Sequence, residues 1–191
     1  MGRNLLFSAI FAAIICVFGF LYIPLPGIQS GIVLQNMMCV LAAALLGGAT
    51  GAAPAALFLA AGVLGLPVFS GGMGGFHVLT NINGGFKIGY ALGALMAGLI
   101  AGKPRAEERK ILPGTAVRIS VAMLAGMLAI YLPEIFYVLA FNAEQLGADG
   151  ALKLFFAAFF VPFLPADFAK AVAGTLLALK VRPAVAQYLH S

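Results

Sequence analysis

The side chains best suited to chemistry in this chain are two opposite charges within the segment FLPADFAKAV. Asp167 and Lys170 stand three positions apart, so on a helix they share one face. A charge inside a membrane costs about 2.5 kcal/mol or more, so such groups face a bundle interior or a cavity and are candidates for function. One interpretation is a pair that binds a polar ligand; the other is an ion pair that only tolerates burial.

Lys87 is a second cation in apolar surroundings, and no acid stands near it in the sequence. It follows Gly84 and Gly85 at the start of a long apolar segment. A cation beside a glycine-rich loop is typical of a receptor for an anionic group. The alternative is that its ammonium group extends to the membrane interface.

Side-chain amides supply further polar groups. Gln35 and Asn36 lie early in an apolar segment, in LPGIQSGIVLQNMM, and Asn83 lies in NINGG. Buried amides need hydrogen-bond partners. They serve either as ligand contacts or as polar contacts between helices, and the sequence leaves both open.

The segment LPVFSGGMGGFHVLTNINGGFKIGY, residues 66–90, contains three Gly-Gly pairs between two apolar runs. Glycine allows turns with positive φ or the close approach of another group to the backbone. A flexible linker is the alternative. The apolar side chains of the segment do not suit a solvated tether, which favours a binding loop.

The amino-acid composition indicates the kind of fold that positions these polar side chains. Hydrophobic residues make up 63% of the 191-residue chain, charged residues make up 9%, and the mean hydropathy is +1.08. A soluble fold of this size cannot bury so much apolar surface. We therefore expect an all-α integral membrane protein, a six-transmembrane-helix bundle in one domain, 1–191. The expected helices are 5–22, 31–46, 52–66, 84–101, 116–139 and 164–179, with a Gly-rich loop at 67–85 and a cytoplasmic loop at 102–115.

Two expected helices, 31–46 and 52–66, are shorter than the roughly 20 residues that span a hydrocarbon core. They are tilted, extended into their loops or shielded inside the bundle. A four-span fold with two re-entrant segments is the alternative.

The distribution of charge predicts the orientation. Basic residues stand at three places that six spans bring to one face: Arg3, Lys103, Arg105, Arg109, Lys110, Lys180 and Arg182. The positive-inside rule makes that face, and both termini, cytoplasmic. Acidic residues expected outside are Glu134, Glu144 and Asp149. The net charge of +5 is thus a topology signal, and no basic patch with interleaved aromatics indicates nucleic-acid binding.

The sequence lacks the residues that several classes of reaction require. No G-x-x-x-x-G-K-[ST] phosphate loop occurs, so ATP hydrolysis by that motif is not expected. Cys16 and Cys39 lie inside apolar segments and form no ligand spacing with His77 and His190, so we expect no metal site and no cofactor. Serine and histidine are too few, and too far from acids in the sequence, to suggest a nucleophilic triad.

Three segments follow one another along the chain: IPLPGIQSGIVLQNMM, then GLPVFSGGMGG with the later GGFKIG, then FLPADFAK, of which the last two contain the most specific motifs. Together they resemble the BioY family, the S components of energy-coupling-factor (ECF) transporters that bind biotin. The resemblance covers nearly the whole chain and implies a six-helix S-component bundle with the vitamin near the outer face.

The resemblance carries a binding role to Asp167, Lys170, Lys87, Asn83, Gln35, Asn36, Gly72, Gly74 and Gly75. It implies that Asp167 accepts from the ureido N–H groups of biotin, while Lys170 orients Asp167 or donates to the ureido oxygen. Lys87 would meet the carboxylate, and the glycines would let the loop close over the bicyclic ligand. Many family members have Arg at the Lys87 position, and Lys cannot make the bidentate contact of Arg.

The resemblance also implies partners besides biotin and membrane lipid: a transmembrane coupling (T) subunit and two cytoplasmic ATPase subunits. Ala9 and Ala13, four positions apart, match the small-residue pattern of the docking face. The predicted function is therefore a non-enzymatic, biotin-binding subunit in the plasma membrane of a prokaryote. The alternatives are a solitary biotin carrier without ATPases and a membrane-integral enzyme that uses Asp167 and Lys170 as acid and base.

Overall fold

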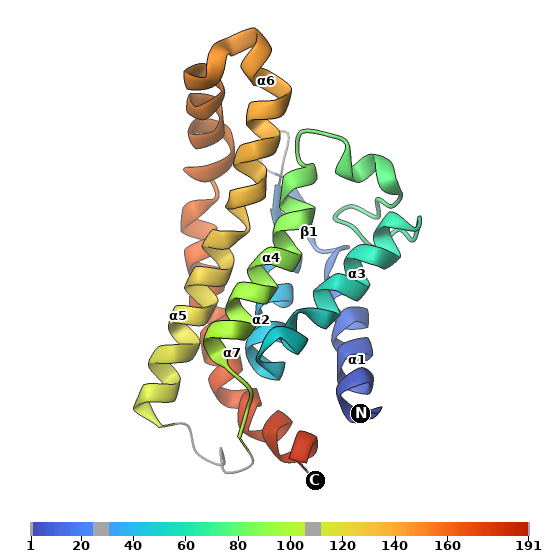
Figure 1. Ribbon diagram of the computed structural model, residues 1–191, viewed down its shortest axis with the longest axis vertical. Coiled ribbons are helices and arrows are strands. Elements are labelled where there is room, and N and C mark those ends of the chain that lie inside the picture. Colours follow the sequence, from blue (N-terminus) through green and yellow to red (C-terminus); the bar gives the residue numbers. More distant parts are fainter. Residues whose placement is uncertain (1, 25–30, 106–111, 191) are drawn as a thin grey trace.

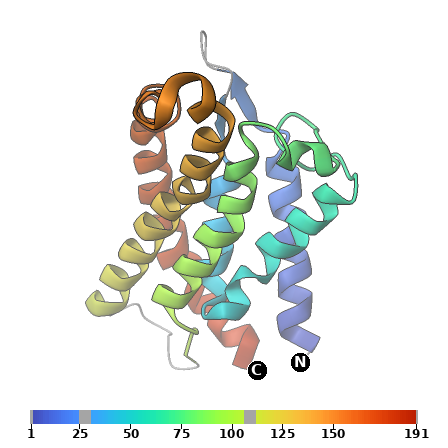
Figure 2. The same ribbon diagram turned by 45° about the horizontal axis from the view of Figure 1, so that its top comes forward.

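The computed structural model describes residues 2–24, 31–105 and 112–190, which form helices and one small hairpin (Figure 1). The elements are α1 Gly2–Phe18, β1 Tyr22–Pro24, β2 Gly31–Val33, α2 Gln35–Leu46, η1 Ala49–Ala52, α3 Ala53–Val63, η2 Phe76–Leu79, α4 Gly84–Ala101, α5 Pro113–Ala129, α6 Tyr131–Leu154, η3 Phe155–Phe160 and α7 Leu164–His190. The helices extend along the length of the molecule, and both chain ends lie at one end of it (Figures 1 and 2).

The centre of the bundle is α2, in which all 12 residues are buried. It packs against α1, α3, α4, α5 and α7. A helix that is apolar on every side belongs in a core, so neighbouring helices shield it from the surroundings. This burial accounts for a helix too short to span a membrane by itself.

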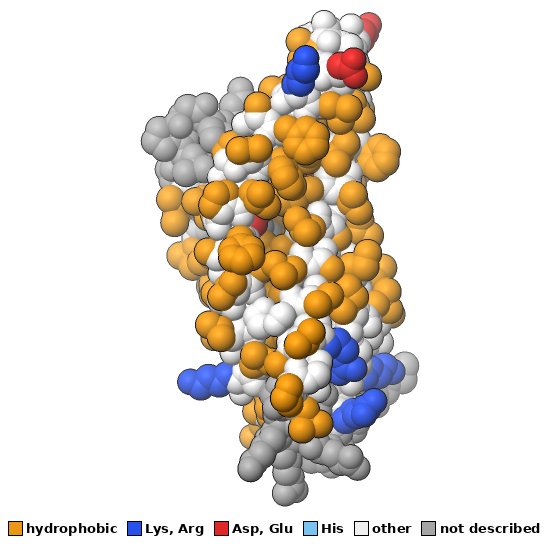
Figure 3. All heavy atoms as spheres, turned by 90° about the vertical axis from the view of Figure 1, so that its left-hand side faces the viewer, with side chains coloured by type: hydrophobic (Ala, Val, Ile, Leu, Met, Phe, Trp, Pro, Cys, Tyr) orange, Lys and Arg blue, Asp and Glu red, His pale blue; other side chains and the backbone are white. Residues whose placement is uncertain are grey.

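One face of the bundle is apolar over most of its height (Figure 3). Figure 3 shows hydrophobic side chains covering the face formed by α5, α6 and α7, with basic groups toward the end that carries the termini. Within the described residues, two helical stretches are long and apolar enough to cross a membrane, Gly84–Ala101 and Pro113–Phe160. The other apolar helices are shorter: Asn4–Phe18, Gln35–Leu46 and Ala49–Val63.

The first three helices differ from their expected bounds because the chain between them forms other structure. The helix expected at 5–22 ends at Phe18, and the one expected at 31–46 begins at Gln35. Between them, Tyr22–Pro24 pairs with Gly31–Val33 as an antiparallel hairpin. The helix expected at 52–66 ends at Val63, ahead of Gly65 and Pro67. By contrast, α4 has the expected bounds, 84–101.

The helix expected at 116–139 is two helices, α5 and α6. Pro133 has no N–H group to donate to the carbonyl of Ala129, so the helical hydrogen-bond ladder is interrupted there. α6 continues to Leu154 and turns at Gly147, whose φ is 70°. The chain turns back within this region, at the top of Figure 1.

Two further bounds change at the other end of the molecule. α7 begins at the expected position, 164, but continues past 179 to His190, with Pro183 inside it. The loop expected at 102–115 is shorter because α5 begins at Pro113, a residue favoured in the first turn of a helix. Arg109 and Lys110, expected in the basic cluster, lie outside the described residues.

Arg182 was expected among the basic groups of the cytoplasmic face, but its side chain is fully buried. Its guanidinium donates to the carbonyl oxygen of Ala44, to that of Ala101 at 3.1 Å and to that of Gly102 at 2.8 Å. These carbonyls belong to the C-terminal ends of α2 and α4, which lack helical donors. A cation at helix C-termini is favourable, so Arg182 joins α7 to both helices.

Candidate ligand-binding site

A cavity of about 380 Å³ lies at the end of the bundle where α2, α4, α6 and α7 begin. Its size falls within the range of small-molecule sites, roughly 300–1,000 Å³. The lining residues are Tyr22, Gly31, Val33, Asn36, Ser70, Gly71, Met73, Asn81, Asn83, Phe86, Lys87, Tyr90, Tyr131, Phe163 and Asp167. They come from the hairpin, the Gly-rich loop and the first turns of the helices.

Each of four helices contributes a polar side chain from its first turn. These residues are Asn36 of α2, Lys87 of α4, Tyr131 of α6 and Asp167 of α7. A helix N-terminus carries partial positive charge, so the carboxylate of Asp167 is favoured in that position. The helix starts therefore gather donors, acceptors and charges around one cavity.

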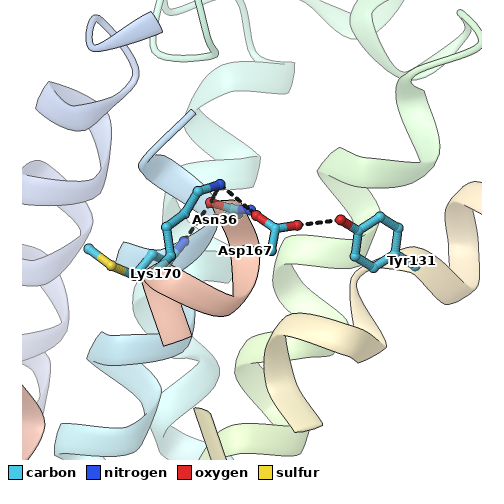
Figure 4. A network of polar contacts seen from close by, with 5 residues as sticks. Asn36, Tyr131, Asp167 and Lys170 are labelled. Carbon is cyan, nitrogen blue, oxygen red and sulfur yellow. Dashed lines mark hydrogen bonds and ion pairs between the residues drawn. The ribbon is translucent and has the colours of Figure 1, made fainter. Parts of the chain in front are cut away.

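Asp167 is the centre of a polar network (Figure 4). Its Oδ1 accepts from Lys170 Nζ at 2.6 Å and from Asn36 Nδ2 at 3.2 Å, and its Oδ2 accepts from the hydroxyl of Tyr131. Asn36 Oδ1 in turn accepts from Lys170 Nζ at 3.3 Å and from the backbone N–H of Met37 at 2.8 Å. These contacts fix the orientation of both the carboxylate and the amide.

The network leaves hydrogen-bonding capacity that no described residue uses. The second N–H of Asn36 has no acceptor, and Asp167 Oδ2 and the oxygen of Tyr131 each retain room for a donor. Lys170 is not part of the cavity wall and lies behind Asp167. The wall at this point thus offers one donor and two acceptors.

Lys87 provides a second polar point in the cavity wall, and its side chain is 7% exposed. Its ammonium group makes no hydrogen bond or ion pair within the described chain. Glu134, one of the acidic residues expected on the outer side of the membrane, has a fully buried side chain. Glu134 Oε2 accepts from the N–H of Phe86 at 2.8 Å and so caps the first turn of α4, where backbone donors lack helical partners.

Aromatic side chains supply the apolar part of the wall. Phe86, Tyr90, Tyr131 and Phe163 line the cavity. The rings of Phe86 and Tyr131 meet edge to face, with their centroids 5.7 Å apart. Such packing holds flat surfaces in place beside the polar groups.

Gln35 differs from the expectation that it contacts ligand, because it lies outside the cavity wall. Its Nε2 donates to the carbonyl of Ile15 at 3.0 Å and to that of Val68 at 2.8 Å, and its Oε1 accepts from Ser70 Oγ. The fully buried amide thus joins α1, α2 and the Gly-rich loop. Gln35 therefore makes polar contacts between structural elements, which was the alternative interpretation of the buried amides.

The three loop glycines expected at the ligand also lie outside the cavity wall, whereas Gly71 is part of it. Gly72 and Gly75 have φ values of 75° and 100°, which favour glycine. A Cβ on Gly74 would stand 2.2 Å from the carbonyl oxygen of Leu66. These glycines give the loop its shape, and its side chains and Gly71 face the cavity.

The sequence did not single out Tyr131, Tyr90, Ser70 or Phe163. The available signal was a polar or aromatic residue at the start of an apolar run. Residues with an ordinary packing role show the same pattern, so the signal does not distinguish them. Among the described residues, no group of three His, Cys, Asp or Glu side chains could hold a metal ion. Asn83, expected at the ligand, does line the cavity, and its buried Oδ1 has no hydrogen-bond partner there.

The fold and cavity are those of a helical membrane protein with a pocket of small-molecule size whose wall has both polar and apolar groups. The chain belongs to the BioY family, whose sequence model matches residues 2–187. It is 35% identical to a biotin transporter BioY of Rhodobacter capsulatus, over 100% of this chain and 97% of that protein. A biotin transporter BioY of Thermotoga maritima is 32% identical, over 94% of this chain and 96% of that protein.

A solved structure is similar to this chain in its fold. The S component for biotin from an ECF-type ABC transporter matches with a TM-score of 0.73 and 26% identity, over 94% of this chain and 90% of that chain. The relatives are named as transporters, so the family is one of transport proteins and not of enzymes.

Proposed function

We propose that the chain is the biotin-binding S component of an ECF-type vitamin uptake transporter. The names of its relatives and of the similar solved structure support biotin as the ligand. The observation that carries the proposal is the set of unused hydrogen-bonding groups around Asp167, because it is complementary to one end of biotin.

Biotin presents two N–H donors and one carbonyl acceptor on its ureido ring. Asp167 Oδ2 and the Tyr131 oxygen accept from the two N–H groups, and the free N–H of Asn36 donates to the carbonyl. Hydrogen bonds to an ionised carboxylate are stronger than neutral ones. Lys170 holds Asp167 as an oriented anion and does not itself reach the ligand.

The remainder of biotin suits the rest of the cavity. The thiolane ring and valeryl chain are apolar, and the aromatic wall includes Phe86 and Tyr90. The terminal carboxylate pairs with Lys87, whose ammonium group has no other partner in the described chain, and Asn83 supplies an amide beside it. An apolar pocket with a few convergent polar groups is the usual form of a small-molecule site.

For the topology we propose six spans, with the cavity toward the outer face and both termini in the cytoplasm of a bacterial cell. The basic groups near the termini support this orientation through the positive-inside rule (Figure 3). All residues of α2 are buried by neighbouring helices, which supports counting α2 as a span that makes little contact with lipid.

Energy would come from separate subunits, a T subunit and two ATPases. Ala9 and Ala13 are both exposed on α1, so their small side chains are accessible for the close approach of a partner helix. Uptake of labelled biotin in cells that lack every T and ATPase subunit tests this point. Transport in such cells would favour the solitary carrier.

Titration calorimetry of the purified protein with biotin tests the main proposal. Tight binding at one site per chain is expected for the wild type. Glu144→Gln is a matched control because Glu144 is exposed on α6, away from the cavity wall. A wild-type protein without tight biotin binding would contradict the proposed ligand.

A further inference from the structure

Three phenylalanine rings enclose the ring of Tyr131. The tyrosine side chain is 4% exposed, and its hydroxyl donates to Oδ2 of Asp167, which joins α6 to α7 (Figure 4). The rings of Phe86, Phe155 and Phe160 meet it edge to face, with centroid distances of 5.7, 6.3 and 5.1 Å. Such packing limits tilting of the tyrosine ring. It therefore also limits movement of the hydroxyl, which is the part of the side chain farthest from the backbone.

Two of these rings stand behind the cavity wall. Among the described residues, Phe86 lines the cavity, whereas Phe155 and Phe160 belong to η3 and do not. The contact of Phe160 with Tyr131 is the shortest of the three, and the ring of Phe160 lies 6.1 Å from that of Phe155. A ligand in the cavity thus meets Tyr131 but not the rings that hold it from behind.

The shape of η3 explains how both rings reach the same tyrosine. On an α-helix, residues five apart point about 140° away from each other, so Phe155 and Phe160 could not both face Tyr131. η3 is a turn of π-helix, in which the N–H of Val161 donates to the carbonyl of Phe156, five residues back, at 2.9 Å. The wider turn brings residues five apart nearly above each other. Turns of this kind are rare and occur frequently at functional sites.

We infer that Phe160 is a positioning residue for the ligand. Held by the wide turn of η3, it fixes the ring of Tyr131 so that the hydroxyl keeps its place beside Asp167 and presents an acceptor to the ligand. This inference rests on the proposed function, since it takes a ureido N–H group of biotin to meet the Tyr131 oxygen. Phe160 thereby affects affinity without touching the ligand, and its effect passes through one hydroxyl.

A double-variant cycle tests this route. Phe160→Leu keeps an apolar side chain but removes the ring, so biotin binding in calorimetry should weaken about threefold, within the range that an aromatic pair contributes. In the Tyr131→Phe background no hydroxyl remains to be positioned, so the same substitution should change affinity less than about 1.5-fold. Phe160→Ile goes through the same cycle, so that the result does not depend on the folding of one variant.

The position of the hydroxyl can also be followed without ligand. The chain contains five tyrosines, so carbon-13 labelling of the ring carbon that bears the hydroxyl gives few NMR signals. Tyr131→Phe identifies the signal of Tyr131 by its loss. We expect Phe160→Leu to shift or broaden this signal because the hydrogen bond to Asp167 loosens. The signal of Tyr188, which is exposed near the end of α7, should stay in place.

Phe136→Leu is the matched control, because Phe136 lies on the same helix as Tyr131 but is 72% exposed. It should change neither the affinity nor the Tyr131 signal. Unchanged biotin affinity in Phe160→Leu, an equal loss in both backgrounds, or an unmoved Tyr131 signal would each overturn the inference. Failure of the proposed function gives a different result: the wild type would bind no biotin, while the Tyr131 signal would still respond to Phe160→Leu.

Discussion

Replacing Asp167 by Asn is the most direct test of the polar network. The substitution keeps the size of the side chain and removes its charge, so a ligand N–H meets a neutral acceptor. A hydrogen bond to a charged group contributes about 1.5–3 kcal/mol and a neutral one about 0.5–1.5 kcal/mol. The difference, about 1–1.5 kcal/mol, predicts biotin binding weaker by roughly 5- to 12-fold.

The same change also affects stability, and this effect must be separated from binding. Lys170 is 7% exposed and bonds to Asp167 at 2.6 Å, so Asp167→Asn leaves a buried cation without its anion. Breaking a buried pair in this way costs about 3–5 kcal/mol. The double variant Asp167→Asn, Lys170→Gln removes both charges and should recover much of the lost stability.

Calorimetry with biotin and thermal unfolding without it, on the wild type and both variants, separate the two effects. We expect stability to return in the double variant while biotin affinity remains low. Affinity that recovers together with stability would refute the reasoning, since Asp167 would then act only as the partner of Lys170. Biotin binding to folded Asp167→Asn within twofold of the wild type would refute it as well.

Three further substitutions test other contacts, one in the site and two between the helices and the loop that surround it. Tyr131→Phe removes the hydroxyl bonded to Asp167 and should weaken biotin binding about fivefold, for a loss of about 1 kcal/mol; unchanged affinity in calorimetry would exclude Tyr131 as a ligand contact. Gln35→Ala removes donors to the carbonyls of Ile15 and Val68, so the thermal midpoint should fall and loop proteolysis should quicken, whereas equal proteolysis would contradict a role in holding the loop. Arg182→Gln should lower the free energy of unfolding by about 3 kcal/mol or more, because it removes charge-assisted hydrogen bonds. The dissociation constant for biotin in the folded fraction should change less than about threefold. A large loss of affinity would show that the contacts of Arg182, at the opposite end of α2 and α7, shape the site.

The sequence predicted the fold where apolar periodicity alone decides the structure. α4 has the expected bounds: it begins with Gly84 and Gly85, and Gly-Lys-Pro follows its last residue. The extended hairpin before α2 was missed, because a few apolar residues favour strand and helix alike. The length of α6 was missed because its last turns continue through polar residues that resemble a loop.

For the site, the sequence identified charges and amides but not their directions. Asp167, Lys87 and Asn36 were expected at the ligand and do line one cavity. Gln35 and Asn36 are neighbours with the same chemistry, yet adjacent side chains on a helix point about 100° apart, so only one of them faces the cavity. The sequence did not reveal that the carboxylate of Glu134 is buried and accepts from the N–H of Phe86 in another helix, because this contact depends on how the helices pack.

The contacts of Arg182 have a consequence for how the pocket can open. α2, α4 and α7 meet through its guanidinium at one end, and α2 and α7 meet again through Asn36 and Asp167 at the other. Helices α2 and α7 are joined at both ends and resist separation, so we expect them to keep their places whether the pocket is filled or empty. We therefore expect exchange of ligand to occur by displacement of the Gly-rich loop, which borders the cavity through Ser70, Gly71 and Met73. Antibody fragments raised against that loop should trap bound biotin or exclude free biotin without unfolding the bundle.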